Sequence, residues 1–317
     1  MYTKYLLFAA LLGTAGSCAA VDAGLLDLVM PDAKVVSGIH VDHTKATPFG
    51  RYVLSRMQSD DQGLQKFMDQ TGFDPRRDLN EILVASTGTE GNSQTLIVGQ
   101  GVFDAARMTS AAKQAGVALT RYHGVDILQH NEHDRSGGIA LLDSGTALIG
   151  DLASVQAAID RRHNGSAPPV ALAEKVRKVS MNNDVWFLTI GPPSQFLNGK
   201  IADPNLNGAM KGDMLQSVEE ASGGLRFGAA NVNLTAEVVA RSEKDASALA
   251  DVIRFFAGML QMNRPSGPAT GKPISLLDNL QLSAEANIMK LSLAMPEDQL
   301  EKILESRPPR KAVSGRR

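Results

Sequence analysis

The chain has 317 residues, of which 43% are hydrophobic and 21% are charged. It therefore has enough apolar sequence to bury a core, and its length suggests two domains or one domain built from two copies of a module. With 32 basic and 34 acidic residues, the formal net charge is −2, which gives no indication of a nucleic-acid partner.

The first 19 residues have the three-part order of a secretory signal. Lys4 and the amino terminus form a short positive region, and residues 5–12 form an apolar stretch. Ser17 and Ala19 are small residues at the positions that a signal peptidase reads. The apolar stretch is far shorter than the roughly 20 residues that span a bilayer. We therefore expect residues 1–19 to be removed and the body to be extracytoplasmic, either periplasmic or secreted.

Cys18 is the only cysteine, and it lies in this cleavage region. Either it leaves with the signal, or it becomes the lipidated first residue of a membrane-anchored lipoprotein. In both cases the body has no cysteine, which excludes disulfides, thiolate nucleophiles and Cys-ligated metal centres. Export without disulfides indicates a protein of the bacterial envelope.

The pattern of residues 31–163 predicts a first half in which strands alternate with capped helices. Helices should begin after Thr47, Asp104 and Asp151, whose side chains can accept hydrogen bonds from the first helical turn. The third of these helices should end at Gly165. Strands are expected at residues 34–41, 79–86, 94–101, 118–130, 138–143 and 147–149.

Residues 170–306 predict a second half with a similar order of elements. Ser242 and Asp245 have the spacing of a capping box at the start of a long amphipathic helix. Pro296 should open a final helix. Strands are expected at residues 184–191, 224–229, 231–240, 280–286 and 288–294, and linkers at 163–169 and 264–273.

Both halves follow a β-α-β-β-α order and then continue with further strands and a closing helix. We interpret this as an internal duplication of topology. The predicted fold class is α+β, with two topologically similar halves, each an antiparallel sheet with helices packed on one face.

Three segments in the first half also resemble a known family. They are residues 122–127, 140–143 and 150–160. A glycine–aspartate corner at residues 71–78, which precedes them, is also similar. In this order they resemble the core pattern of a family of exported bacterial proteins that is defined by a domain of unknown function. The resemblance covers roughly residues 31–190. It implies the fold and export, and it carries no activity.

Two His-x-x-His pairs are the only candidates for a metal site. His40 and His43 lie at a predicted strand end, and His130 and His133 lie in a predicted polar loop. His130, Glu132 and His133 could together bind zinc. Nothing else in the sequence fixes their geometry, so we interpret them as loop polarity and predict neither a metal nor a cofactor.

The C-terminal tail, residues 307–317, is predicted to be disordered. It either contacts anionic lipid headgroups or cell-wall polymers, or serves only as a solubilising tail. Its five cations are Arg307, Arg310, Lys311, Arg316 and Arg317.

No motif brings together a nucleophile, a base and oxyanion donors. We therefore predict an exported envelope protein with a non-enzymatic binding or structural role, whose partner is an apolar ligand or an envelope polymer. Membrane contact is expected only through a lipidated Cys18 or through the basic tail. The alternative is an extracytoplasmic hydrolase whose site is built from scattered residues.

Overall fold

The structure is a computed structural model, and it describes residues 20–56, 62–88, 93–132, 135–193, 216–262, 279–298 and 300–301. Its strands are β1 (Val35–His40), β2 (Leu79–Ser86), β3 (Thr95–Gly101), β4 (Ala118–Tyr122), β5 (Val125–Glu132), β6 (Arg135–Leu141), β7 (Thr146–Asp151), β8 (Val185–Ile190), β9 (Val218–Phe227), β10 (Asn231–Ala240), β11 (Leu280–Glu285) and β12 (Ile288–Pro296). Its helices are α1 (Ala23–Leu26), α2 (Val41–Ala46), α3 (Pro48–Arg56), α4 (Gln62–Thr71), α5 (Pro75–Asp78), α6 (Ala105–Gln114), α7 (Leu152–Asn164), α8 (Val170–Ser180) and α12 (Glu243–Met262).

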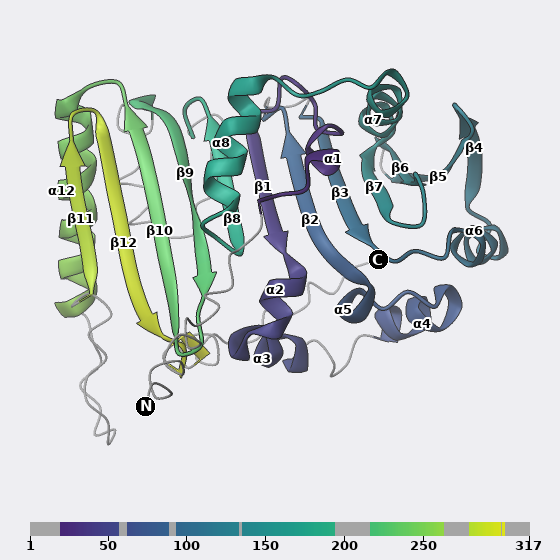
Figure 1. The fold of residues 1–317 in the computed structure, drawn as a ribbon, viewed down its shortest axis with the longest axis horizontal. Helices are drawn as coiled ribbons and strands as arrows, with labels where there is room; N and C mark the ends of the chain where they lie inside the picture. The colour runs from purple at the N-terminus through teal and green to yellow at the C-terminus, as the bar shows by residue number, and fades with distance from the viewer. Residues whose placement is uncertain are drawn as a thin grey trace, which may run out of the picture.

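The described strands form one antiparallel sheet in the order β11-β12-β10-β9-β8-β1-β2-β3-β7-β6-β5-β4 (Figure 1). The predicted α+β class is therefore confirmed. The two halves do not form separate sheets, because β1 pairs directly with β8 at the centre. In this pairing Val36 lies opposite Leu188, and Gly38 lies opposite Trp186.

The strand order is alike on both sides of this central pair. The first three strands of each half are neighbours, namely β1-β2-β3 and β8-β9-β10. A helix then follows, α6 or α12, and the last strand of the half returns to pair with the third, as β7 does with β3 and β12 with β10. The first half has two further strands beyond this pattern.

Most of the predicted signals for helix ends are present. Asp104 and Asp151 each accept a hydrogen bond from a backbone N–H in the first turn of the following helix. Gly165 ends α7 in the left-handed conformation, with φ of 64°, which glycine adopts without steric cost. The Ser242 hydroxyl accepts a hydrogen bond from the amide of Asp245 at 3.1 Å, as a capping box requires.

Several predicted limits differ from the structure. The strand predicted at residues 118–130 is two strands, β4 and β5, and β6 begins at Arg135 and not at residue 138. Strand β9 begins at Val218 and not at residue 224; its first part contains Glu219 and Glu220, two adjacent charges of a kind typical of a solvated surface. Helix α8 has no counterpart among the predicted elements, because it follows Pro168 and Pro169 directly and lies beside a predicted linker. Its apolar side chains nevertheless have helical spacing; the buried ones are Leu172, Val176 and Val179.

The main core lies on the face of the sheet that α1, α7 and α8 cover. Trp186 is 1% exposed and packs beside β1, where Gly38 leaves room for it. A Cβ atom on Gly38 would lie 2.5 Å from the indole ring, so no other residue fits at this position without a shift. The fit of Trp186 against Gly38 therefore joins the two halves through their side chains as well as through their strands.

Helices cover the two faces of the sheet at different places. Figure 1 shows α8 in front of the sheet, beside β8, and α12 behind β11 at the end of the sheet, where it also contacts β12 and β10. No helix among the described residues covers the front face of β9, β10, β12 and β11. In this region, beside α8, the structure contains a groove.

Candidate functional site: a polar groove beside α8

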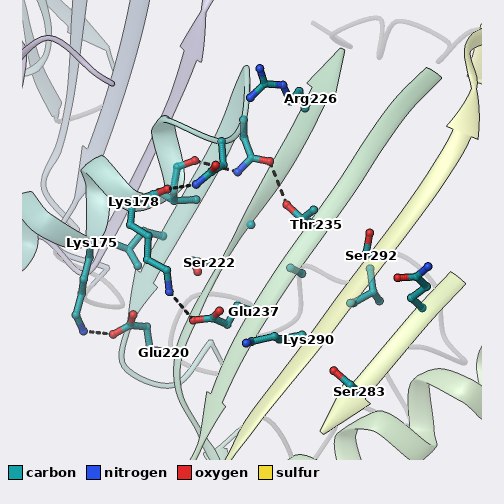
Figure 2. Close-up of a pocket in the computed structure, with 18 of the residues that line it drawn as sticks. Lys175, Lys178, Glu220, Ser222, Arg226, Thr235, Glu237, Ser283, Lys290 and Ser292 are labelled. Carbon is teal, nitrogen blue, oxygen red and sulfur yellow. Dashed lines mark hydrogen bonds and ion pairs between the residues drawn. The ribbon is translucent and has the colours of Figure 1, made fainter. Parts of the chain in front are cut away.

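The groove has a volume of about 850 Å³ and crosses the second half of the sheet next to α8 (Figure 2). Residues of α8 and of the turn that follows it form one wall, and β8, β9, β10, β12 and β11 form the floor. The side chains used below are Lys175, Lys178, Asn183, Glu220, Ser222, Arg226, Thr235, Glu237, Gln281, Ser283, Lys290 and Ser292.

The register of the strands arranges the floor in rows, because residues directly opposite each other project from the same face. One row runs across four strands, and its members are Ser222, Glu237, Lys290 and Ser283. The next row contains Thr235, Ser292 and Gln281. Neighbouring strands are roughly 4.8 Å apart, so four strands span about 14 Å. The floor is thus a two-dimensional array of hydroxyl, amide and charged groups.

Two ion pairs connect helix α8 to this floor. Lys178 Nζ donates to Glu237 Oε1 at 3.0 Å, and Lys175 donates to the carboxylate of Glu220 (Figure 2). Both lysines belong to one face of the helix because they are three residues apart. These contacts connect the wall to strands β9 and β10.

Asn183 makes a third connection between wall and floor. Its side-chain oxygen accepts a hydrogen bond from the Thr235 hydroxyl at 3.1 Å, and its amide donates to the carbonyl of Val179 at 2.9 Å. Asn183 is 3% exposed, so its amide is fixed on both sides. It therefore holds the Thr235 side chain in one orientation at the centre of the groove.

The groove carries an excess of positive charge. Four cationic side chains line it, which are Lys175, Lys178, Arg226 and Lys290, against the two carboxylates of Glu220 and Glu237. Its net charge is therefore +2, whereas the whole chain has a net charge of −2. Lys290 is exposed, and no ion pair connects it to another described residue. The sequence alone gave no indication of this local excess.

Sequence reasoning missed the groove because its residues come from six elements between Lys175 and Ser292. The available signal was the alternation in the strands. In β11, the exposed Gln281, Ser283 and Glu285 alternate with half-buried residues, which marks a polar face on a strand that is apolar on the other side.

A second polar cluster lies at the C-terminal end of β1, and it contains the first predicted histidine pair. His40 ends β1 and is 9% exposed. Its Nδ1 lies 3.2 Å from Glu81 Oε1, and its Nε2 lies 3.2 Å from the carbonyl oxygen of Ser180. His43, on α2, has its Nδ1 2.7 Å from Oδ1 of Asp184, whose side chain is fully buried. The pair thus binds two carboxylates, one from each half of the chain.

The environment of His40 raises its pKa above 6.5. Burial lowers the pKa, but the hydrogen bond to Glu81 and the negative charge of Glu81 outweigh it, with further help from the Ser180 carbonyl and the charge of Asp184. Folding therefore favours the protonated ring.

This cluster predicts a pH dependence of stability. Protonated His40 contributes stability fully below pH 6.5, and the contribution is lost as the pH rises through the folded pKa. We expect His40→Gln to cost more free energy of unfolding at pH 5.5 than at pH 8.5, as measured by urea denaturation of both proteins at the two pH values. An equal cost at both pH values would contradict the role of the pair with Glu81.

The other predicted site residues lie elsewhere. Cys18 and the five cations of the tail are outside the described residues, and so is His133. The backbone of His130 and Glu132 belongs to β5, where Glu132 lies opposite Arg135 of β6, so the predicted polar loop is a paired strand at these positions. In the part of the chain that the structure describes, no three His, Asp or Glu side chains come together as a metal site.

Comparison with known proteins supports the fold. No protein-family model matches the sequence, and no curated protein matches it significantly. Among solved structures, crystal form III of TP0453 has a TM-score of 0.51 at 13% identity, covering 91% of this chain and 99% of the other. Crystal form IV of TP0453 has a TM-score of 0.52 at 13% identity, covering 90% and 98%. The chain is thus similar in fold to TP0453 along nearly its whole length.

Proposed function

We propose that this chain is an exported protein of the bacterial envelope with a non-enzymatic binding role, and that the groove beside α8 is its binding site. The observation that carries the proposal is the floor of the groove, where polar side chains stand in rows beside a wall held by ion pairs. Such an array offers many hydrogen bonds to a ligand that lies across the strands, and it favours an envelope polymer over an apolar ligand.

Export rests on the three-part pattern of residues 1–19. None of the described helices is both long and apolar enough to cross a membrane. Mass spectrometry of the mature N-terminus distinguishes cleavage after Ala19 from a lipidated Cys18.

Thr235→Val tests the binding site, because it keeps the shape of the side chain and removes the hydroxyl that Asn183 holds. We expect it to weaken the binding of soluble oligosaccharides about fivefold, in line with the loss of roughly 1 kcal/mol per hydrogen bond. Isothermal titration calorimetry with a neutral probe, maltohexaose, and an acidic probe, hexagalacturonate, measures the affinity.

Thr189→Val is the matched control, since Thr189 lies on β8 and, by the register of β8 with β1, on the opposite face from Trp186 and Leu188. It should bind these probes as the unchanged protein does. If neither oligosaccharide binds the unchanged protein, or if the two variants behave alike, the groove is not the binding site.

A hydrolase is the alternative, and one observation favours it. The contact between His43 and the buried Asp184 resembles the base and its orienting carboxylate in a catalytic triad. No described hydroxyl is hydrogen-bonded to His43, so the triad is incomplete in the described residues. If the chain is a hydrolase using this pair, cleavage of chromogenic esters or glycosides should disappear in His43→Ala and persist in Thr235→Val.

A further inference from the structure

We propose that the ligand of the groove is an acidic oligosaccharide segment, a chain of hydroxyl-bearing sugar units with carboxylate groups, lying across strands β9, β10, β12 and β11. This inference rests on the proposed function and adds the chemical class of the ligand. Three features of the groove carry it.

The first feature is that side chains provide the recognition over most of the floor. The groove lies on a face of the sheet, where the backbone N–H and C=O groups of β9, β10 and β12 are used in pairing on both sides. A peptide that binds as an added strand needs an open sheet edge, and among these strands only β11 lies at the end of the described sheet, with β12 as its partner. Over β9, β10 and β12 the ligand must therefore present its own polar groups toward the side chains of the floor.

The second feature is the kind of polar group on the floor. Hydroxyl and amide side chains both donate and accept hydrogen bonds, as sugar hydroxyls do. They occur in adjacent rows on neighbouring strands, and the members are Ser222, Thr235, Gln281, Ser283 and Ser292. With strands roughly 4.8 Å apart, the spacing is close to the length of one sugar unit, about 5 Å, so successive units can each meet a row member.

The third feature is the sign and position of the charges. Lys175 and Lys178 form ion pairs with carboxylates of the floor, so their charges are already compensated within the protein. Lys290 projects from the middle of the floor in the same row as Glu237, which is itself engaged by Lys178 (Figure 2). Lys290 thus places an exposed positive charge among the hydroxyl and amide groups of the floor, which suits an anionic group on the sugar chain.

The test compares two ligands with the same sugar chain that differ in their carboxylate groups. Hexagalacturonate carries one carboxylate per sugar, and its fully methyl-esterified form has the same sugars without charge. We expect hexagalacturonate to bind at least about tenfold more tightly in low salt, and Lys290→Gln to weaken its binding about fivefold, because charge-assisted hydrogen bonds are stronger than neutral ones. The affinity of the methyl ester should not change in this variant.

Lys113→Gln is the matched control, because Lys113 is an exposed lysine on α6, outside the groove. It should leave both affinities unchanged. Thermal unfolding followed by circular dichroism verifies that the variants are folded.

Each alternative result has a distinct meaning. Equal affinity for the two ligands, with the loss in Thr235→Val retained, would overturn the acidic class and leave a groove that binds neutral glycans. Tighter binding of hexaglutamate than of hexagalacturonate would replace the glycan by an acidic peptide. If Thr235→Val and Lys290→Gln both bind like the unchanged protein, the groove is not the site, and the proposed function falls with the inference.

Discussion

Replacing Trp186 with alanine is expected to lower the free energy of unfolding by about 4 kcal/mol, the usual cost of removing a large aromatic side chain from a core. Trp186 is 1% exposed and belongs to the core cluster that α1, α7 and α8 cover. The cavity that it would leave lies where β8 meets β1, and Gly38 opposite it has no side chain to fill the space. Urea denaturation followed by circular dichroism measures the change.

Phe187→Ala is the control for this experiment. Phe187 is the next residue of β8, so its side chain projects from the other face of the sheet, and it is 38% exposed. Its loss should cost about 1 kcal/mol, because much of its surface is already in contact with solvent. If the two variants lose similar amounts of stability, the packing of Trp186 against β1 does not join the halves.

Asp184→Asn is expected to destabilise the protein by about 3 kcal/mol, as the removal of one partner from a buried charged contact usually does. The carboxylate is fully buried, and it accepts a hydrogen bond from the amide of Phe227 at 2.6 Å while it contacts His43 at 2.7 Å. An asparagine side chain has a single acceptor oxygen and no charge, so it cannot accept a hydrogen bond at both positions. Chemical denaturation at pH 7 measures the loss.

An exposed aspartate gives the comparison. The Asp251 side chain is 75% exposed and pairs with Arg254 on the surface of α12. Asp251→Asn should change the free energy of unfolding by less than about 0.5 kcal/mol. If Asp184→Asn costs no more than this, the buried contacts of Asp184 contribute little to the stability of the fold.

The local elements could be predicted from the sequence because their signals are local. Asp104, Asp151 and Ser242 cap helices at the predicted positions, and both β2 and β10 have the predicted limits. Each of these features depends on a few neighbouring residues, so one sequence suffices.

The joining of the two halves could not be predicted in this way. The pairing of β1 with β8 depends on the fit of Trp186 to Gly38, two residues that are almost 150 positions apart. The alternation of β1 and β8 shows that each is a strand, but it does not show which strand lies beside it. A single sequence contains no signal for that choice.

The groove was beyond prediction for a related reason. The roles of Glu220 and Glu237 depend on the lysines of α8, with which they form ion pairs. Because α8 is not among the elements predicted from the sequence, the prediction contains no wall for the groove. The apolar spacing of Leu172, Val176 and Val179 would have been enough to find the helix, although not the strands that it covers.

The central place of β1 has a consequence for the order in which the chain folds. During synthesis β1 emerges first and can pair with β2 after about 40 further residues, but its other partner follows only after about 150. Until then, one edge of β1 has no strand beside it and the indole that covers Gly38 is absent. An open edge of this kind is a site for pairing with other chains. Polypeptides that stop before Val185 should therefore self-associate, whereas the completed chain closes this edge within itself.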